Sequence, residues 1–152
     1  MTKLSKKVIT FGCRLNNLES ELIYQQLKQN SIDENIFIFN TCAVTSEAER
    51  KARQSIRKIK KENPSAKIVV TGCAAQIDPN KWLKMEEVSN VIGNSEKTKK
   101  EFWKNFSLNQ QNELITSDIM LVKEDKTDFS GLVNQNSRYF LQIQNGCDHR
   151  CT

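Results

Sequence analysis

The feature that most limits the fold is a series of short apolar runs at residues 8–11, 36–39, 68–71 and 88–92 of the 152-residue chain. The second and third runs do not alternate with polar residues. Residues 36–39 and 68–70 consist entirely of Ile, Val and Phe. β-branched and aromatic side chains in unbroken series are typical of strands that are buried on both faces of a sheet. The runs therefore predict the interior strands of one sheet.

Helical patterns separate these runs. After the first run, Asn17 can cap a helix whose apolar residues recur at helical spacing, namely Leu18, Leu22, Ile23 and Leu27. After the second run, Ser46 followed by Glu49 is a capping-box signature. That helix should end at about residue 62, because the residue before Pro64 disfavours the helical region.

Two further helices are expected after the third and fourth runs, beginning near Pro79 and Ser95. Strict alternation of strands and helices predicts right-handed βαβ units and a parallel sheet. We therefore expect an open α/β domain over residues 1–105. Residues 106–137 are rich in polar side chains and are expected to form a linker with a possible edge strand. A strand-like run at 139–143 predicts that residues 138–152 begin a second domain.

Composition narrows the class of protein. No apolar run approaches the roughly 18 residues that span a bilayer, and the start of the chain lacks the apolar core of a signal peptide. We therefore expect a cytoplasmic protein with no membrane partner. Five cysteines, an odd number, argue against a disulfide framework and favour thiolate chemistry. The net charge of +5 suggests an anionic partner.

Three cysteines each follow the end of a predicted strand: Cys13, Cys42 and Cys73. In a parallel sheet the carboxyl ends of neighbouring strands lie side by side, at the edge where open α/β folds bind ligands. Glycine precedes Cys13 and Cys73, and glycine permits a close approach of the backbone to a bulky group. The three thiols should therefore converge on one ligand site.

Several interpretations of these thiols compete. Free cysteines are often small buried hydrophobic residues, and structural zinc usually takes four ligands in closely spaced pairs. Three widely spaced thiolates suit an iron–sulfur cluster with one iron left without a protein ligand. Near the end of the chain, Cys147 and Cys151 form a C-x3-C pair that is compatible with zinc, redox chemistry or neither. We interpret His149 between them as a solvated side chain rather than a ligand.

The cysteine motifs resemble, in order, those of the N-terminal part of the radical-SAM methylthiotransferases. They read TFGCRLN at 10–16, NTCAVT at 40–45, VTGCAAQ at 70–76 and NGCDHRCT at 145–152. The resemblance covers the whole chain. Together with RKARQ at 50–54, these motifs are most similar in sequence to those of the branch that modifies threonylcarbamoyladenosine in tRNA.

This resemblance implies an enzyme that adds a methylthio group to C2 of N6-threonylcarbamoyladenosine next to the anticodon of tRNA. It also implies two [4Fe–4S] clusters and S-adenosyl-L-methionine as cofactors. By analogy, Cys13, Cys42 and Cys73 hold the auxiliary cluster, and Cys147 and Cys151 hold part of the radical-SAM cluster. The sulfur and electron donors are not indicated.

The third cysteine of the family's C-x3-C-x2-C motif would fall at position 154, beyond residue 152. We therefore expect the chain to be the N-terminal piece of a longer enzyme and to be inactive by itself. One alternative is a non-catalytic iron–sulfur or zinc-binding module. Another is a methylthiotransferase of the isopentenyladenosine-tRNA or ribosomal-protein branch.

Positive charge concentrates in one predicted helix. Between residues 45 and 67 there are eight Lys and Arg against three Glu, an excess equal to the +5 of the whole chain. The simplest interpretation is a solvated amphipathic helix. Because this helix leaves the same strand end as Cys42, we also expect phosphate contacts with tRNA from its first turns, through Arg50, Lys51, Arg53 and Arg57.

Overall fold

The computed structural model describes residues 7–32, 35–106, 113–118, 121–122, 127 and 143. Within this part the strands are β1 (Val8–Thr10), β2 (Ile36–Thr41), β3 (Lys67–Gly72), β4 (Asn90–Ile92) and β5 (Glu113–Ile115). The helices are α1 (Arg14–Gln29), α2 (Ser46–Glu62), α3 (Cys73–Ile77), α4 (Pro79–Leu83), α5 (Asn94–Lys97) and α6 (Lys100–Asn105). None of these helices is both long and apolar enough to cross a membrane. Cys147, His149 and Cys151 lie outside the described residues, as does the predicted strand at 139–143 apart from Ile143.

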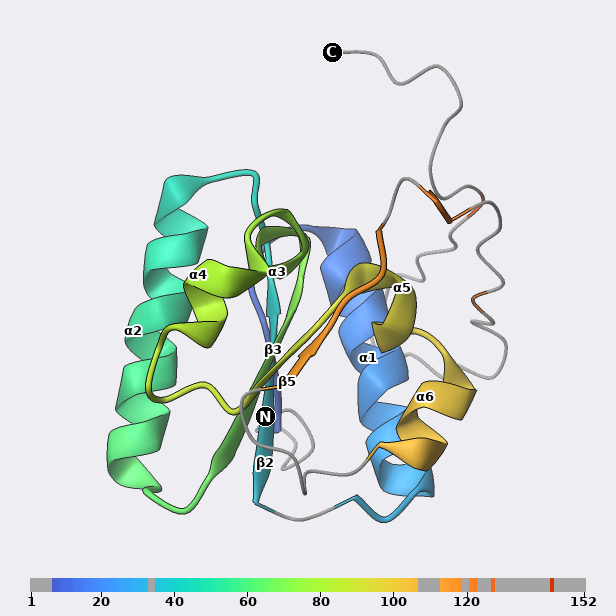
Figure 1. Ribbon diagram of the computed structural model, residues 1–152, viewed down its shortest axis with the longest axis horizontal. Coiled ribbons are helices and arrows are strands. Elements are labelled where there is room, and N and C mark those ends of the chain that lie inside the picture. The colour runs from blue at the N-terminus through green and yellow to red at the C-terminus, as the bar shows by residue number, and fades with distance from the viewer. Residues whose placement is uncertain are drawn as a thin grey trace.

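The five strands form one sheet in the order β1-β2-β3-β4-β5, and every neighbouring pair is parallel. This arrangement confirms the predicted α/β class with an open parallel sheet (Figure 1). The short apolar run at 114–115 lies in β5, which pairs with β4 at the edge of the sheet. The sheet therefore continues past residue 105 into the segment that was expected to be mainly linker.

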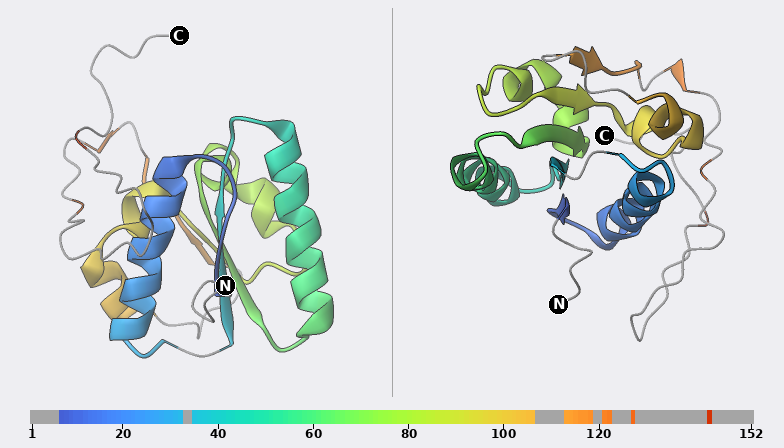
Figure 2. Two further views of the ribbon diagram at one scale, coloured as in Figure 1. Left: turned by 180° about the vertical axis from the view of Figure 1, so that it is seen from behind. Right: turned by 90° about the horizontal axis from the view of Figure 1, so that it is seen from below.

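Both faces of the sheet are covered, as the unbroken apolar runs predict. Ile38 of β2 and Val69 of β3 are register partners and pack with Ile23 of α1 and Trp103 of α6 on one face. On the other face, Val70 belongs to the cluster that contains apolar residues of α2 and α4. The result is a sheet between two layers of helices, with α1 and α6 on one side and α2 and α4 on the other (Figure 2).

The hand of the connections differs from the expectation of right-handed units throughout. The chain crosses the sheet in one direction, from β1 to β2 to β3, while α1 and α2 cover opposite faces. Two crossovers in the same direction on opposite faces have opposite hands, so the prediction that every unit is right-handed is wrong. The physical reason is burial: with this strand order, right-handed connections alone would leave one apolar face of the sheet bare.

Helix α1 begins earlier than predicted. Its N-cap is Cys13, which makes no capping hydrogen bond through its side chain, and Asn17 lies inside the first turn. Position 12 is a glycine at φ +112°, so the chain turns directly from β1 into the helix. The predicted apolar stripe is buried as expected.

Helix α2 differs from its predicted start by one residue. The capping side chain is Thr45, whose hydroxyl accepts a hydrogen bond from the backbone N–H of Ala48 at 3.2 Å. Glu49 does not complete a capping box, because its carboxylate pairs with Arg53 and with Lys81. The helix ends at residue 62, before Pro64, as predicted. The helix expected near residue 95 is divided into the two short helices α5 and α6.

Candidate metal centre

The three strand-end cysteines lie at one edge of the sheet, formed by the carboxyl ends of β1, β2 and β3. Cys13 caps α1 after β1, Cys42 directly follows β2, and Cys73 is the first residue of α3 after β3. All three are free thiols. We refer to this edge, with its three cysteines and the residues that contact them, as the cysteine edge.

Two glycines bring the strand ends into contact. A Cβ atom on Gly12 would lie 2.3 Å from the Cβ and 2.6 Å from the Sγ of Cys42. A Cβ atom on Gly72, at φ +99°, would lie 2.2 Å from the backbone oxygen of Thr41. Both positions therefore require glycine, and they place the loops that carry Cys13 and Cys73 directly against the end of β2.

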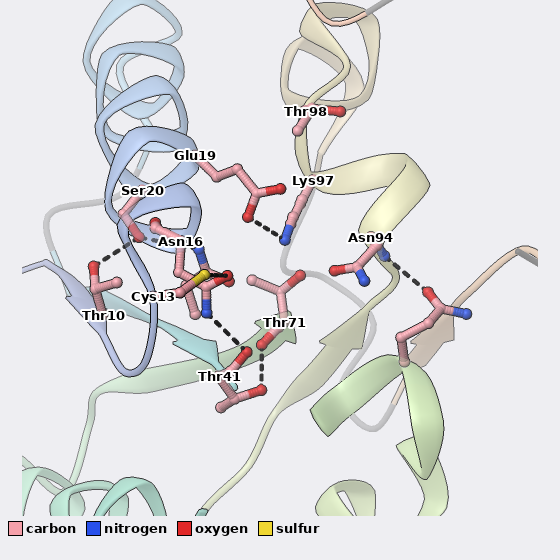
Figure 3. A network of polar contacts seen from close by, with 12 residues as sticks. Thr10, Cys13, Asn16, Glu19, Ser20, Thr41, Thr71, Asn94, Lys97 and Thr98 are labelled. Atoms are coloured by element: carbon pink, nitrogen blue, oxygen red, sulfur yellow. Dashed lines mark hydrogen bonds and ion pairs between the residues drawn. The ribbon is translucent and has the colours of Figure 1, made fainter. Parts of the chain in front are cut away.

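A set of buried polar side chains ties the same strand ends together (Figure 3). The side-chain amide of Asn16 donates to the backbone oxygen of Phe11 at 2.8 Å and to that of Thr41 at 3.2 Å. The hydroxyl of Thr41 in turn donates to the backbone oxygen of Thr71 at 2.6 Å. Asn16 is only 2% exposed, so these bonds are shielded from water. The cysteine edge is therefore held by side chains that sequence reasoning did not single out.

The three thiols have different surroundings. Cys13 is exposed, with its Sγ 3.9 Å from Oδ1 of Asn16. Cys42 is 4% exposed, and its sulfur accepts a hydrogen bond from the backbone N–H of Val44 at 3.4 Å. Burial raises the pKa of the half-buried Cys73 thiol. A nearby cation and a hydrogen bond from Asn94 oppose that rise only in part. Burial therefore disfavours the charged thiolate of Cys73, and a metal centre that binds it must stabilise that charge.

The end of β4 adds a fourth group of residues to the cysteine edge, although it carries no cysteine. The backbone N–H of Asn94, the first residue of α5, donates to Oε1 of Gln76 at 2.8 Å. Lys97, the last residue of α5, places its Nζ 2.6 Å from Oε2 of Glu19 on α1 (Figure 3). Sequence reasoning missed Asn94, Lys97 and Glu19. The available signal was Gly93 before Asn94, which repeats the glycine placement at positions 12 and 72.

The three thiols are chemically suited to a metal centre that prefers sulfur ligands. Thiolates are the ligands of iron–sulfur clusters, and backbone or amide N–H groups near the sulfurs stabilise them in the charged form. One such donor is the backbone N–H of Val44, which donates to the sulfur of Cys42. In the part of the chain that the structure describes, no three Cys, His, Asp or Glu residues are arranged so that they could hold a metal ion. The thiols thus share an edge without forming a complete ligand set.

The predicted phosphate-contacting residues of α2 have partners within the protein, with one exception. Arg53 pairs with Glu49 and lies over the ring of Trp82, with 5.5 Å from its Cζ to the ring centroid. The other two engaged residues form the pairs Arg57–Glu87 at 3.7 Å and Lys51–Glu47 at 2.9 Å. Arg50 is exposed and forms no ion pair with any described residue.

Comparison with known proteins gives a consistent match. The profile described as "Uncharacterized protein family UPF0004" matches residues 6–93, more than half of the chain. The threonylcarbamoyladenosine tRNA methylthiotransferase MtaB of Rickettsia prowazekii is 48% identical over 98% of this chain and 34% of its own length. The protein of the same name from Aquifex aeolicus is 30% identical over 94% of the chain and 37% of its own length.

Relatives with a second name also match. The tRNA-2-methylthio-N(6)-dimethylallyladenosine synthase of Pelagibacter ubique is 29% identical over 93% of this chain and 34% of its own length. The chain thus spans about a third of the length of the curated relatives that match it over nearly all of its residues.

Proposed function

The chain belongs to the UPF0004 family, and from this premise we propose that it forms the N-terminal domain of a tRNA methylthiotransferase acting on threonylcarbamoyladenosine. The observation that carries the proposal is the placement of Cys13, Cys42 and Cys73 at the carboxyl ends of three adjacent parallel strands. The choice of nucleoside rests on the 48% identity with a relative of that name, against 29% for the dimethylallyladenosine synthase matched over a similar length.

We further propose that Cys13, Cys42 and Cys73 hold an auxiliary [4Fe–4S] cluster and leave one iron without a protein ligand. When bound, such a cluster supplies an iron site at which sulfur can be carried for insertion. The protein's own part is support. Gly12 and Gly72 let the loops that carry Cys13 and Cys73 pack against the end of β2, Asn16 fixes the loop that carries Cys13, and the backbone N–H of Val44 donates to the sulfur of Cys42.

The cysteines that we assign to the radical-SAM cluster lie outside the described residues. We propose Cys147 and Cys151 as ligands of a second, radical-SAM [4Fe–4S] cluster with S-adenosyl-L-methionine as its co-substrate. The support is the NGCDHRCT motif at 145–152. A polypeptide of residues 1–152 carries two of the three cysteines of that motif, so we propose that it does not turn over alone. We place the enzyme in the cytoplasm with tRNA.

The cluster proposal is tested by anaerobic reconstitution with iron and sulfide. In a Cys147→Ala/Cys151→Ala background, we expect about four iron and four sulfide per chain, with charge-transfer absorbance. Single Cys13→Ala, Cys42→Ala or Cys73→Ala changes in that background should each lose most of the bound iron. Tight binding of zinc without iron or sulfide would instead support a non-catalytic zinc-binding module.

The activity proposal is tested on tRNA that contains threonylcarbamoyladenosine. Mass spectrometry of nucleosides should show no methylthio product when residues 1–152 are supplied with S-adenosyl-L-methionine and dithionite. Product formation by that polypeptide would contradict the proposed inactivity. A full-length enzyme that modified only the dimethylallyl nucleoside would contradict the choice of substrate.

We also propose that the first turns of α2 contact tRNA phosphate through Arg50, Lys51, Arg53 and Arg57. The support is position, because α2 starts four residues after Cys42 and its outer face is strongly basic. Arg50 gives the sharpest test, since it is exposed and forms no ion pair with a described carboxylate. We expect Arg50→Glu to weaken tRNA binding and to reduce its salt dependence, whereas Arg57→Glu, with its partner Glu87, should do so less. Equal affinity and salt slope for Arg50→Glu and wild type would overturn the proposal.

A further inference from the structure

The polypeptide that leaves β5 passes the helix that carries Cys73. Because β5 is parallel to the other strands, its carboxyl end lies at the same end of the sheet as Cys73, the first residue of α3. Figure 1 shows the chain after β5, in orange, running past α5. We refer to residues 116–118 as the exit strap. The contacts of this strap decide how firmly the chain beyond β5 is attached to the domain.

Gln76 of α3 binds the exit strap through its side-chain amide. Its Nε2 donates to the backbone oxygen of Ser117 at 3.2 Å. Its Oε1 accepts a hydrogen bond from the backbone N–H of Asn94 at 2.8 Å, and Figure 3 marks this bond beside Asn94. Both polar atoms of the amide are therefore engaged. One side chain thus connects the helix that begins with Cys73, the start of α5 and the chain that leaves the sheet.

Helix α5 holds the chain after β5 at two further points. The hydroxyl of Ser117 donates to Oε1 of Glu96, which is 7% exposed. A buried carboxylate needs hydrogen-bond donors, so this bond anchors the strap to the domain interior. The hydroxyl of Thr127 donates to Oγ1 of Thr98, the C-cap of α5, at 2.9 Å. The chain therefore meets the same helix twice after it leaves β5.

The backbone of the exit strap also packs closely against the end of β4. The N–H of Gly93 donates to the backbone oxygen of Ile115 at 2.8 Å. A Cβ atom on Gly93 would lie 3.2 Å from the Cα of Thr116 and 2.9 Å from Oε1 of Gln76. Backbone and side-chain contacts thus converge on one short stretch, whereas a mobile segment makes few contacts with its domain.

We infer that Gln76 and Glu96 are positioning residues that clasp the exit strap, and that they fix the path by which the polypeptide leaves the sheet relative to Cys73. The contacts of this clasp are all made between side chains and backbone of the chain itself. Its consequence for activity rests on the proposed function. There, the clasp limits how the part of the enzyme beyond residue 118 moves relative to the cysteine edge.

The clasp is tested by backbone NMR relaxation of the reduced chain of residues 1–152. The wild type should give order parameters of about 0.85 at residues 116–118, the value of rigid backbone. Gln76→Leu and Ser117→Ala each remove one attachment and should lower these values in part. The double variant should bring them below about 0.6, the flexible range, while residues 68–70 of β3 keep their wild-type values. A flexible strap in the wild type, or an unchanged strap in the double variant, would overturn the clasp.

A matched pair of variants separates the lost donor from a change in charge. Gln76→Glu keeps an oxygen that can accept the N–H of Asn94 but cannot donate to the backbone oxygen of Ser117. It should loosen the strap and change the exchange protection of the Asn94 amide by less than about twofold. Asn80→Asp makes the same change of charge at an exposed position of α4 and should leave the strap rigid. Equal loosening by both variants would contradict the role of the Gln76 donor.

The consequence for activity is tested in the full-length enzyme on tRNA that contains threonylcarbamoyladenosine. Gln76→Glu should lower kcat by about tenfold and change KM for tRNA by less than about twofold, because the loosened strap misplaces groups that the enzyme itself carries. A loosened strap with wild-type kcat would overturn the effect on activity. Absence of product with the wild type would instead overturn the proposed function, and the NMR result would still decide the clasp.

Discussion

The cysteine edge and the outer face of α2 both carry charged side chains, but they hold them in opposite ways. At the edge, the ammonium of Lys97 and the carboxylate of Glu19 are almost fully removed from water. Around α2, the five ion pairs between residues in the described part of the chain connect side chains that are all at least 24% exposed. The helix has many charges at little cost, whereas the ion pair that described residues form at the cysteine edge is costly.

This difference shows why counting charges is a poor guide to a site. The composition of residues 45–67 drew attention to α2, yet three of its four singled-out cations are engaged by carboxylates of the same domain. The buried lysine contributes one charge among 23 basic residues and leaves no mark on composition. Desolvation and proximity to the thiols distinguish it, and both arise only on folding.

The largest expected effect concerns the backbone of the cysteine edge. Gly72→Ala should cost more than about 3 kcal/mol in the free energy of unfolding, because φ is +99° and the new Cβ would meet backbone atoms of Thr41. Gly93→Ala is the matched control, since φ there is −72° and its two nearest contacts are the side-chain ends of Glu96 and Gln76. Urea unfolding measures both. Equal losses would mean that the positive φ at position 72 adds no cost of its own.

The next effect compares the two kinds of ion pair directly. Lys97→Met should cost about 3 kcal/mol, because it leaves the carboxylate of Glu19 buried and unpaired. Lys81→Met, which breaks the partly exposed pair with Glu49, should cost less than about 1 kcal/mol. The double variant Lys97→Met/Glu19→Gln should regain most of the loss. Similar losses for Lys97→Met and Lys81→Met would remove the contrast between the two regions.

A smaller effect on stability is expected when the pH is lowered, through the ion pair between Glu49 of α2 and Lys81 of α4. The hydrogen bond from Lys81 lowers the pKa of the Glu49 carboxyl, and Arg53 adds to this. A carboxyl whose pKa is lower in the folded state stabilises the fold above its unfolded pKa and loses this contribution as pH falls through the folded value. The stability difference between wild type and Glu49→Gln, less than about 1 kcal/mol at pH 7, should therefore shrink toward about pH 3 in urea unfolding. A difference that grew on acidification would contradict the assignment.

The smallest effect is expected on the outermost turn of α2. Lys51→Ala breaks a pair with Glu47 in which both side chains are more than half exposed. Solvent screens this pair, so the urea midpoint should not change measurably, and added salt should not alter that result. A clear loss of stability would show that the surface pairs of α2 matter more than their exposure indicates.

Local patterns predicted much of the fold. The unbroken Ile, Val and Phe runs at 36–39 and 68–70 lie in β2 and β3, and Pro64 marks the end of α2, because each depends on burial or backbone geometry within a few residues. The placement of Cys13, Cys42 and Cys73 after successive strands followed from the same runs. The α2 cap was misplaced by one residue because Thr45 and Ser46 are both good caps, and the hydrogen bond from the Ala48 N–H to the Thr45 hydroxyl distinguishes them only in the folded chain.

The amino-acid sequence by itself thus determined the strands, most helices and the edge of the sheet that carries the three cysteines, since these follow from periodicity and from chain connectivity. Tertiary structure alone decided which faces the helices cover, and hence the hand of the first two connections. It also decided that Lys97 meets Glu19 across 78 residues of sequence. The physical reason is that burial and ion pairing depend on which residues, far apart in the sequence, come together in the interior of the fold. Local sequence patterns do not contain that information.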